Sequence, residues 1–87
     1  MKLNTNIILR EMQGEAVLLN LETGDYFSLN HVGSEIIRCI EENMSAEEIA
    51  GKITDMYEID LETAKSDVIA LIDDLVRNNI LEDLQAV

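Results

Sequence analysis

The chain has 87 residues, and 18 acidic against 6 basic residues give it a formal net charge of −12. Nucleic acids and anionic membrane surfaces attract proteins through Lys and Arg, so this charge argues against both as partners. Hydrophobic residues make up 47% of the chain, which argues against intrinsic disorder and is enough for a core. The length fits a single domain covering residues 1–87.

The N-terminal segment predicts neither a membrane span nor a signal peptide. No apolar run approaches the roughly 20 residues that a spanning helix needs. The Ile7–Leu9 stretch is shorter than the apolar region of a signal peptide. The single cysteine, Cys39, has no partner for an internal disulfide, so we expect a reducing, cytoplasmic location.

The first third of the chain predicts three strands joined by two turns. The strands are expected at Ile7–Met12, Ala16–Leu21 and Tyr26–Leu29. Gly24 can adopt the positive φ that the second turn requires. In the third strand, alternation places Phe27 and Leu29 on one face and Tyr26 and Ser28 on the other. Such a meander needs a helical layer to be stable.

From Asn30 onward the apolar spacing becomes helical and predicts three helices. They are expected after the N-cap Asn30 to about Glu42, from the Ser45–Glu48 capping box to about Tyr57, and from the cap Asp60 to about Asn78. Asn79 suits the left-handed conformation that ends a helix. We expect Ile80 and Leu81 to pack back on the core, before a frayed acidic tail.

The third helix carries two apolar stripes. The first consists of Leu61, Ala64, Val68, Leu71 and Leu75, and the second of Ile69, Ile72 and Val76, with Lys65 among them. The combined arc is wider than the ~100° that one packing face needs. Two interpretations stay open: a central helix that packs on two neighbours, or a helix whose second stripe lines a groove.

The residues that carry catalysis and metal binding are scarce. His31 and Cys39 are the only possible thiol–imidazole pair, and along a helix they would stand about 12 Å apart. We therefore expect Cys39 in the core and His31 in solvent. No spacing suits a metal site, and the scattered glycines form no phosphate loop. The sequence predicts a binding module without catalytic residues, metal or cofactor.

An ordered set of segments resembles the PqqD-like family. It covers about residues 7–83 and comprises Leu19–Asn30, Val32, Gly33, Ile36, Ser45–Ile49, Tyr57, Asp67, Val68, Leu71, Leu75, Ile80 and Leu81. The resemblance implies an α+β, winged helix-turn-helix-like fold, with a three-stranded antiparallel N-terminal sheet packed on a three-helix bundle.

The resemblance also implies a function, that of a stand-alone recognition element for ribosomally made, modified peptides. Family members bind the leader segment of a precursor peptide and present it to a separate modifying enzyme or leader peptidase. The leader adds as a strand to the third strand, against the third helix. Carried onto this sequence, the peptide-binding residues are Asp25, Tyr26, Phe27, Ser28, Leu29, Lys65, Ile69, Ile72 and Val76. Lasso-peptide biosynthesis is favoured, with synthesis of the cofactor PQQ as the alternative.

The residues of the third strand agree with strand addition independently of the resemblance. The strand contains neither proline nor lysine, the residues that usually block an exposed edge. The same open edge would serve a homodimer or a generic dimerisation or adaptor domain, and these alternatives remain. A DNA-binding winged helix is disfavoured because the third helix carries two basic residues, Lys65 and Arg77, against four acidic ones. An acidic carrier protein is disfavoured because Ser34 follows Gly33 rather than aspartate.

Overall fold

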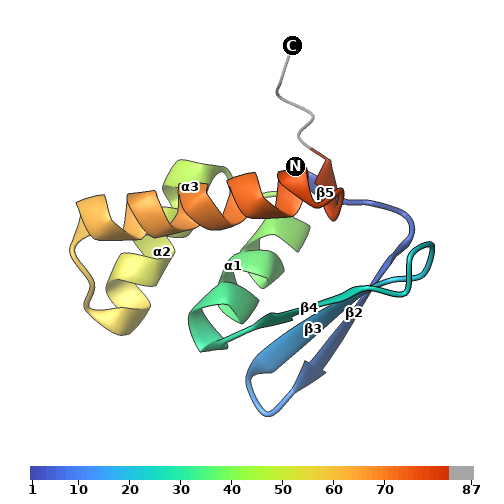
Figure 1. Cartoon of the computed structure of the whole chain (residues 1–87). Helices are drawn as coiled ribbons and strands as arrows, with labels where there is room; N and C mark the ends of the chain where they lie inside the picture. Colours follow the sequence, from blue (N-terminus) through green and yellow to red (C-terminus); the bar gives the residue numbers. More distant parts are fainter. Residues whose placement is uncertain (83–87) are drawn as a thin grey trace.

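The computed structural model describes residues 1–82, which form three helices and two antiparallel sheets (Figure 1). The elements are, in chain order, β1 (Lys2–Leu3), β2 (Ile7–Met12), β3 (Glu15–Asn20), β4 (Tyr26–Leu29), α1 (His31–Glu41), α2 (Ala46–Tyr57), α3 (Leu61–Arg77) and β5 (Leu81–Glu82). The α+β architecture predicted from the sequence is confirmed. The expected frayed tail falls on residues 83–87, which lie outside the described part of the chain.

The larger sheet has the strand order β2-β3-β4. Its first hairpin turns at Gln13 and Gly14, whose φ angles of 53° and 82° are typical of a type I′ turn. A Cβ at Gly14 would stand 2.5 Å from the imidazole of His31, an exposed side chain that would have to move aside. Leu18 stands opposite Leu9 on one side and Phe27 on the other, so the apolar inner face is in register across all three strands.

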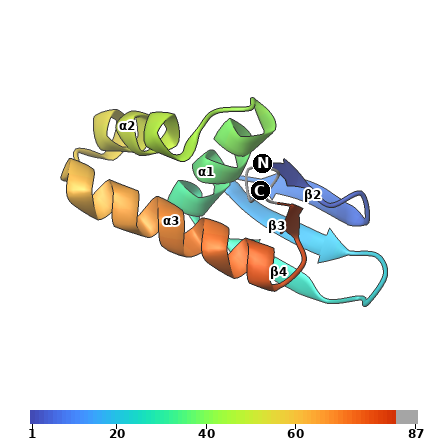
Figure 2. The same ribbon diagram turned by 90° about the horizontal axis from the view of Figure 1, so that it is seen from above.

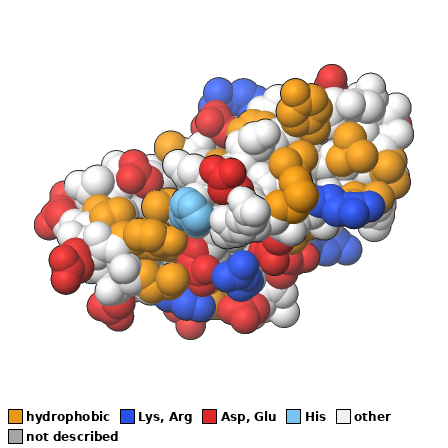
Figure 3. Space-filling view, turned by 90° about the horizontal axis from the view of Figure 1, so that it is seen from below, with side chains coloured by type: hydrophobic (Ala, Val, Ile, Leu, Met, Phe, Trp, Pro, Cys, Tyr) orange, Lys and Arg blue, Asp and Glu red, His pale blue; other side chains and the backbone are white. Residues whose placement is uncertain are grey.

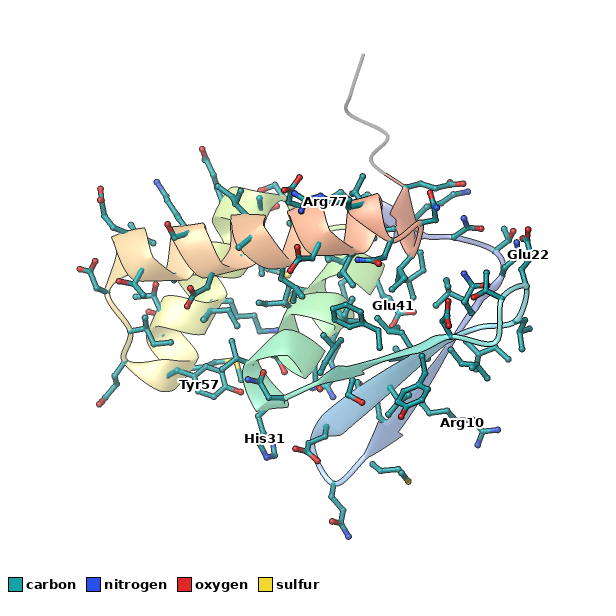
Figure 4. All side chains as sticks on the ribbon, viewed as in Figure 1. Arg10, Glu22, His31, Glu41, Tyr57 and Arg77 are labelled. Carbon is teal, nitrogen blue, oxygen red and sulfur yellow. The ribbon has the colours of Figure 1, made fainter. Side chains whose placement is uncertain are left out.

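The two faces of this sheet differ in burial. Ala16, Leu18 and Leu29 point toward the helices and are buried. The outer face exposes Ile8 and Tyr26, and hydrophobic side chains are visible on this side of the molecule (Figure 3). Arg10 points away from the helices on the same face (Figure 4). An antiparallel sheet with one solvated face is common.

The smaller sheet was not predicted. β1 pairs with β5, with Lys2 opposite Glu82 and Leu3 opposite Leu81. The backbone N–H of Asn4 donates to the carbonyl of Ile80 at 2.8 Å, which joins the chain ends. Strands of two residues are too short to show alternation. The expectation that Ile80 and Leu81 pack back is confirmed, since both are buried.

Each helix begins at the residue that the sequence indicates. The side chain of Asn30 accepts the N–H of Gly33 at 2.9 Å, and the side chain of Asp60 accepts the N–H of Glu62 at 3.2 Å. Ser45 and Glu48 form the reciprocal capping box. The backbone N–H of Ser45, and then its hydroxyl, hold the pKa of the Glu48 carboxyl below its usual value. α3 ends before Asn79, which has the expected left-handed conformation with φ 60°.

α1 lies between the larger sheet and α3, and it carries much of the core (Figure 1). Ile36, Ile37, Cys39 and Ile40 are all buried. Burial is the main cause that raises the pKa of the Cys39 thiol above its usual value, and this thiol is free. The prediction of a core cysteine is confirmed, and His31 is exposed as expected.

A cluster of charges ties α1 to its neighbours at the core boundary. Glu35, on α1, is buried; it accepts a hydrogen bond from Arg38 at 2.8 Å and forms an ion pair with Lys52 of α2 at 3.3 Å. Arg38 also reaches Glu11 of β2 at 3.0 Å. The hydrogen bond to Glu35 raises the pKa of the Lys52 ammonium. The buried carboxylate is therefore paired on both oxygens, as burial of a charge requires.

The central position of α1 predicts an unequal cost for two isoleucine truncations. Ile37→Ala removes a side chain that is 0% exposed and should lower the free energy of unfolding by about 2–5 kcal/mol. Ile8→Ala, on the solvated sheet face where Ile8 is 38% exposed, should cost less than about 1 kcal/mol. Urea unfolding followed by circular dichroism measures both. Equal losses would contradict the core assignment.

Candidate functional site

β4 has one paired edge and one free edge within residues 1–82. Its only strand partner there is β3. The N–H of Asn20 donates to the carbonyl of Asp25 at 2.8 Å, which sets the alternation of the β3–β4 ladder. Since antiparallel ladders repeat every two residues, the backbone groups of Phe27 face β3. Those of Tyr26 and Ser28 therefore point to the free edge and are available to another strand.

Two hollows lie between β4 and α3 and share Phe27 as a common wall. The first, which we call the polar hollow, has a volume of about 460 Å³ and lies at the C-terminal end of α3. The second, the apolar hollow, has a volume of about 370 Å³ and lies near the start of α1. Together they form a groove along the strand, the β4 groove. Viewed from above, the C-terminal part of α3 passes over β4 (Figure 2).

The polar hollow owes its rim to the β3–β4 turn. The side chain of Asn20 accepts the N–H groups of Glu22 at 2.9 Å and of Thr23 at 3.2 Å. The hydroxyl of Thr23 accepts the N–H of Asp25 at 3.2 Å. These bonds hold the turn at the end of the groove, and Figure 4 shows Glu22 at this turn. The opposite wall is the end of α3, where Arg77, Asn78 and Asn79 line the hollow.

The apolar hollow is built from β4, α1, α3 and the segment between α2 and α3. Its hydrophobic lining consists of Phe27, Leu29, Val32, Ile36, Ile59 and Leu71. Gly33 permits close approach of α1 to β4, because a Cβ there would stand 3.2 Å from the Leu29 side chain. Asp67 is the one charged residue in the lining, and it makes no ion pair among residues 1–82. The hollow therefore suits an apolar group with a hydrogen-bond donor or a positive charge near its rim.

The structure brings the strand residues of the predicted site together in the groove. Asp25, Tyr26 and Phe27 line the polar hollow. Ser28 and Leu29 join Phe27 in the apolar hollow. Tyr26 and Ser28 direct their side chains to the opposite, solvated face, and Tyr26 is 72% exposed. They therefore contribute to the groove through their backbone.

The helix residues of the predicted site lie elsewhere. Lys65 and Ile69 line a separate hollow of about 110 Å³ with Ala46 and Glu47 at the start of α2. Ile72 and Val76 are partly buried against the core, and among the described residues neither lines the polar or the apolar hollow. Their predicted contact with a peptide stays a prediction.

Helical geometry explains this placement. At about 100° per residue, Ile69 and Leu71 point roughly 200° apart, onto opposite flanks of α3. The flank that faces β4 carries Asp67, Leu71 and Asn78, which the sequence did not indicate as a site. Leu71 belonged to the stripe interpreted as core. The spacing of Asp67, Leu71 and Asn78 was the available signal, since it places all three on one flank.

Other kinds of site find no support in residues 1–82. No helix among them is long and apolar enough to cross a membrane. No group of three or more His, Cys, Asp or Glu side chains there is placed to hold a metal ion. Tyr57 of α2 and His31 of α1 lie close (Figure 4), but the contact is a long 3.5 Å hydrogen bond from the phenol to the His31 carbonyl.

The fold and the groove define a small α+β domain with an unblocked edge strand beside a helix. Residues 15–81 match the family model described as coenzyme PQQ synthesis protein D (PqqD). The chain therefore belongs to the PqqD family. A comparison with curated protein sequences gives no match.

Two solved structures share this fold over nearly the whole chain. One is described as TbiB1 in complex with the TbiA(beta) leader peptide; it has a TM-score of 0.88 and 35% identity, over 94% of this chain and 95% of that one. The other is described as lasso peptide synthetase B1 complexed with the leader peptide. It has a TM-score of 0.88 and 26% identity, over 94% of this chain and 96% of that one.

Proposed function

We propose that this protein is a non-catalytic recognition element that binds the leader segment of a ribosomally made precursor peptide. It delivers the peptide to a separate modifying enzyme or leader peptidase, in lasso-peptide biosynthesis. The observation that carries the proposal is the free edge of β4, which opens along a groove walled by α3. Both similar structures contain a leader peptide, and one is a lasso peptide synthetase component, which supports the lasso class over PQQ synthesis.

In the proposed complex the leader extends the larger sheet by one strand. The backbone groups of Tyr26 and Ser28 pair with the peptide irrespective of its sequence. Selectivity comes from peptide side chains that enter the groove beside Phe27, Leu29 and Leu71. Only binding is required of these groups. The proposal includes a reducing cytoplasm as the location, which the free, buried thiol of Cys39 suits.

A homodimer through the same edge is the competing use of β4. Two copies would each carry a formal charge of −12, and their repulsion disfavours pairing at low salt. A leader peptide bears no such general penalty. Peptide binding and self-pairing also exclude each other, so a peptide should dissociate any dimer that forms through β4.

Strand addition predicts that a proline on the free edge blocks peptide binding. Ser28→Pro removes an N–H that points out of the sheet, and prolines are tolerated at such edge positions. We expect at least about tenfold weaker binding of the leader peptide with a similar thermal unfolding midpoint. Fluorescence anisotropy with a labelled synthetic leader peptide measures the affinity.

The matched control is Ser28→Ala, which keeps the N–H and removes only a hydroxyl on the solvated face. Its affinity should equal that of the unchanged protein. Should Ser28→Pro unfold the domain, N-methylation of successive peptide residues gives the same test on the ligand. Losses at every second residue are expected, and a uniform response would contradict strand addition.

A second prediction distinguishes the two flanks of α3. Leu71→Asn removes an apolar wall of the groove and should weaken leader binding about tenfold or more, because burying a leucine-sized contact contributes on that order. Ile69→Asn changes an exposed residue on the other flank and should leave affinity unchanged. Isothermal titration calorimetry of both variants measures this. The reverse result would place the peptide against Lys65 and Ile69, as the sequence predicted.

A further inference from the structure

We infer that the β4 groove selects peptides by a two-point pattern. One point is an apolar side chain, and the other is a neutral amide or hydroxyl side chain four residues closer to the peptide's C-terminus. The inference rests on the proposed function and specifies the class of peptide that the site accepts. Three features of the groove carry it: the phase of the free edge, the spacing of the two hollows and their different chemistry.

The phase, meaning which residues of an added strand point into the groove, follows from the backbone of β4. Residues opposite each other in a sheet point their side chains to the same face. A peptide strand on the free edge therefore directs into the groove the residues opposite Asp25, Phe27 and Leu29. The residues opposite Tyr26 and Ser28 make the backbone bonds and point their side chains to solvent. Only every second peptide residue is read by the groove.

The spacing follows from the positions of the hollows along β4. Asp25 belongs to the polar hollow, Leu29 belongs to the apolar hollow, and Phe27 separates them. A peptide residue opposite Leu29 and one opposite Asp25 are four positions apart, whichever direction the peptide runs. Antiparallel pairing is slightly more stable than parallel pairing and continues the pattern of this sheet. In that direction the apolar residue precedes the polar one.

The apolar hollow can hold a hydrophobic side chain of the peptide. Val32, Ile36, Ile59 and Leu71 line it, and they come from α1, α3 and the segment between α2 and α3. A side chain placed here leaves water for a largely hydrocarbon wall. Burial of a leucine-sized group is enough to change affinity by about tenfold or more.

The polar hollow suits a neutral group that both donates and accepts hydrogen bonds. Asn20, Thr23, Asn78 and Asn79 bring amides and a hydroxyl to its walls. Arg77 also lines the hollow, but it is paired with Asp73 and lies 3.9 Å from Asp74. Asp25 adds a negative charge on the other side. With both signs present and the cation already paired, a charged guest gains little over an amide or hydroxyl.

A selection experiment on the full 87-residue chain tests the pattern. The probe is a displayed library of random peptides of about twelve residues, long enough to cover β4 in the extended conformation. Enriched sequences should share an apolar residue followed, four positions later, by Asn, Gln, Ser or Thr. A synthetic consensus peptide should bind at least about tenfold more tightly than the same peptide with these two residues exchanged.

Variants of the two hollows provide matched controls. Leu71→Asn should reduce the enrichment of the apolar residue and leave the polar one. Asn78→Leu should reduce the enrichment of the polar residue and leave the apolar one. Enriched peptides that lack the four-residue spacing, or that bind equally well after the exchange, overturn the inference.

Hydrogen exchange at the backbone amides distinguishes a failure of the two-point pattern from a failure of the proposed function. If the selected peptides protect the amides of Tyr26 and Ser28 but carry no two-point pattern, strand addition stands and the inference is wrong. If neither the selected peptides nor a leader peptide protects those amides, no peptide adds to β4 and the proposed function fails as well.

Discussion

The packing of α1 is the constraint on which the β4 groove depends. α1 contacts β1, β3, β4 and α2, whereas α3 packs mainly on α2 and β5. α1 therefore joins β4 to α2, and α2 in turn holds α3, so the distance between β4 and α3 is set through both helices. Leu29 fixes one side of this arrangement, since it is buried and approaches α1 closely at Gly33. Because the core lies around α1, β4 is anchored through its inner face and its β3 edge while its other edge stays open.

An open edge of this kind supplies affinity and selectivity from different atoms. Backbone bonds to Tyr26 and Ser28 are the same for every extended peptide, so they contribute affinity with little discrimination. In the proposed complex, discrimination comes from the walls of the groove, where Leu71 lines the apolar hollow and Asn78 lines the polar one. The charge of −12 acts at longer range, where it changes the rate of encounter more than the choice of peptide. In the proposed complex, the edge strand thus supplies the backbone bonds and the helix beside it supplies the selectivity.

Most of the fold could be predicted from the sequence because the decisive signals are local. The caps at Asn30, Ser45 and Asp60 bond within three residues, and the strands show their alternation directly. The orientation of α3, in contrast, depends on contacts with segments that are distant in the sequence. Both of its flanks carry apolar residues, and periodicity alone does not say which flank meets the strand. The sequence assigns the flank with Ile69 and Ile72 to the groove, whereas the structure places Leu71 beside β4. The β1–β5 pair was missed because its partners lie at opposite ends of the chain.

The most direct test of strand addition is amide hydrogen exchange of the domain, measured residue by residue by NMR with and without the leader peptide. The amide of Phe27 faces β3, so it should be protected in both states. Those of Tyr26 and Ser28 should exchange rapidly in the free protein and become protected when the peptide binds. The opposite edge of the sheet serves as an internal comparison. The backbone N–H of Leu21 donates to the carbonyl of Asn6, so the N–H groups of the odd-numbered residues of β2 face solvent. Protection at Leu9 and Glu11, with none at Tyr26 and Ser28, would contradict the account.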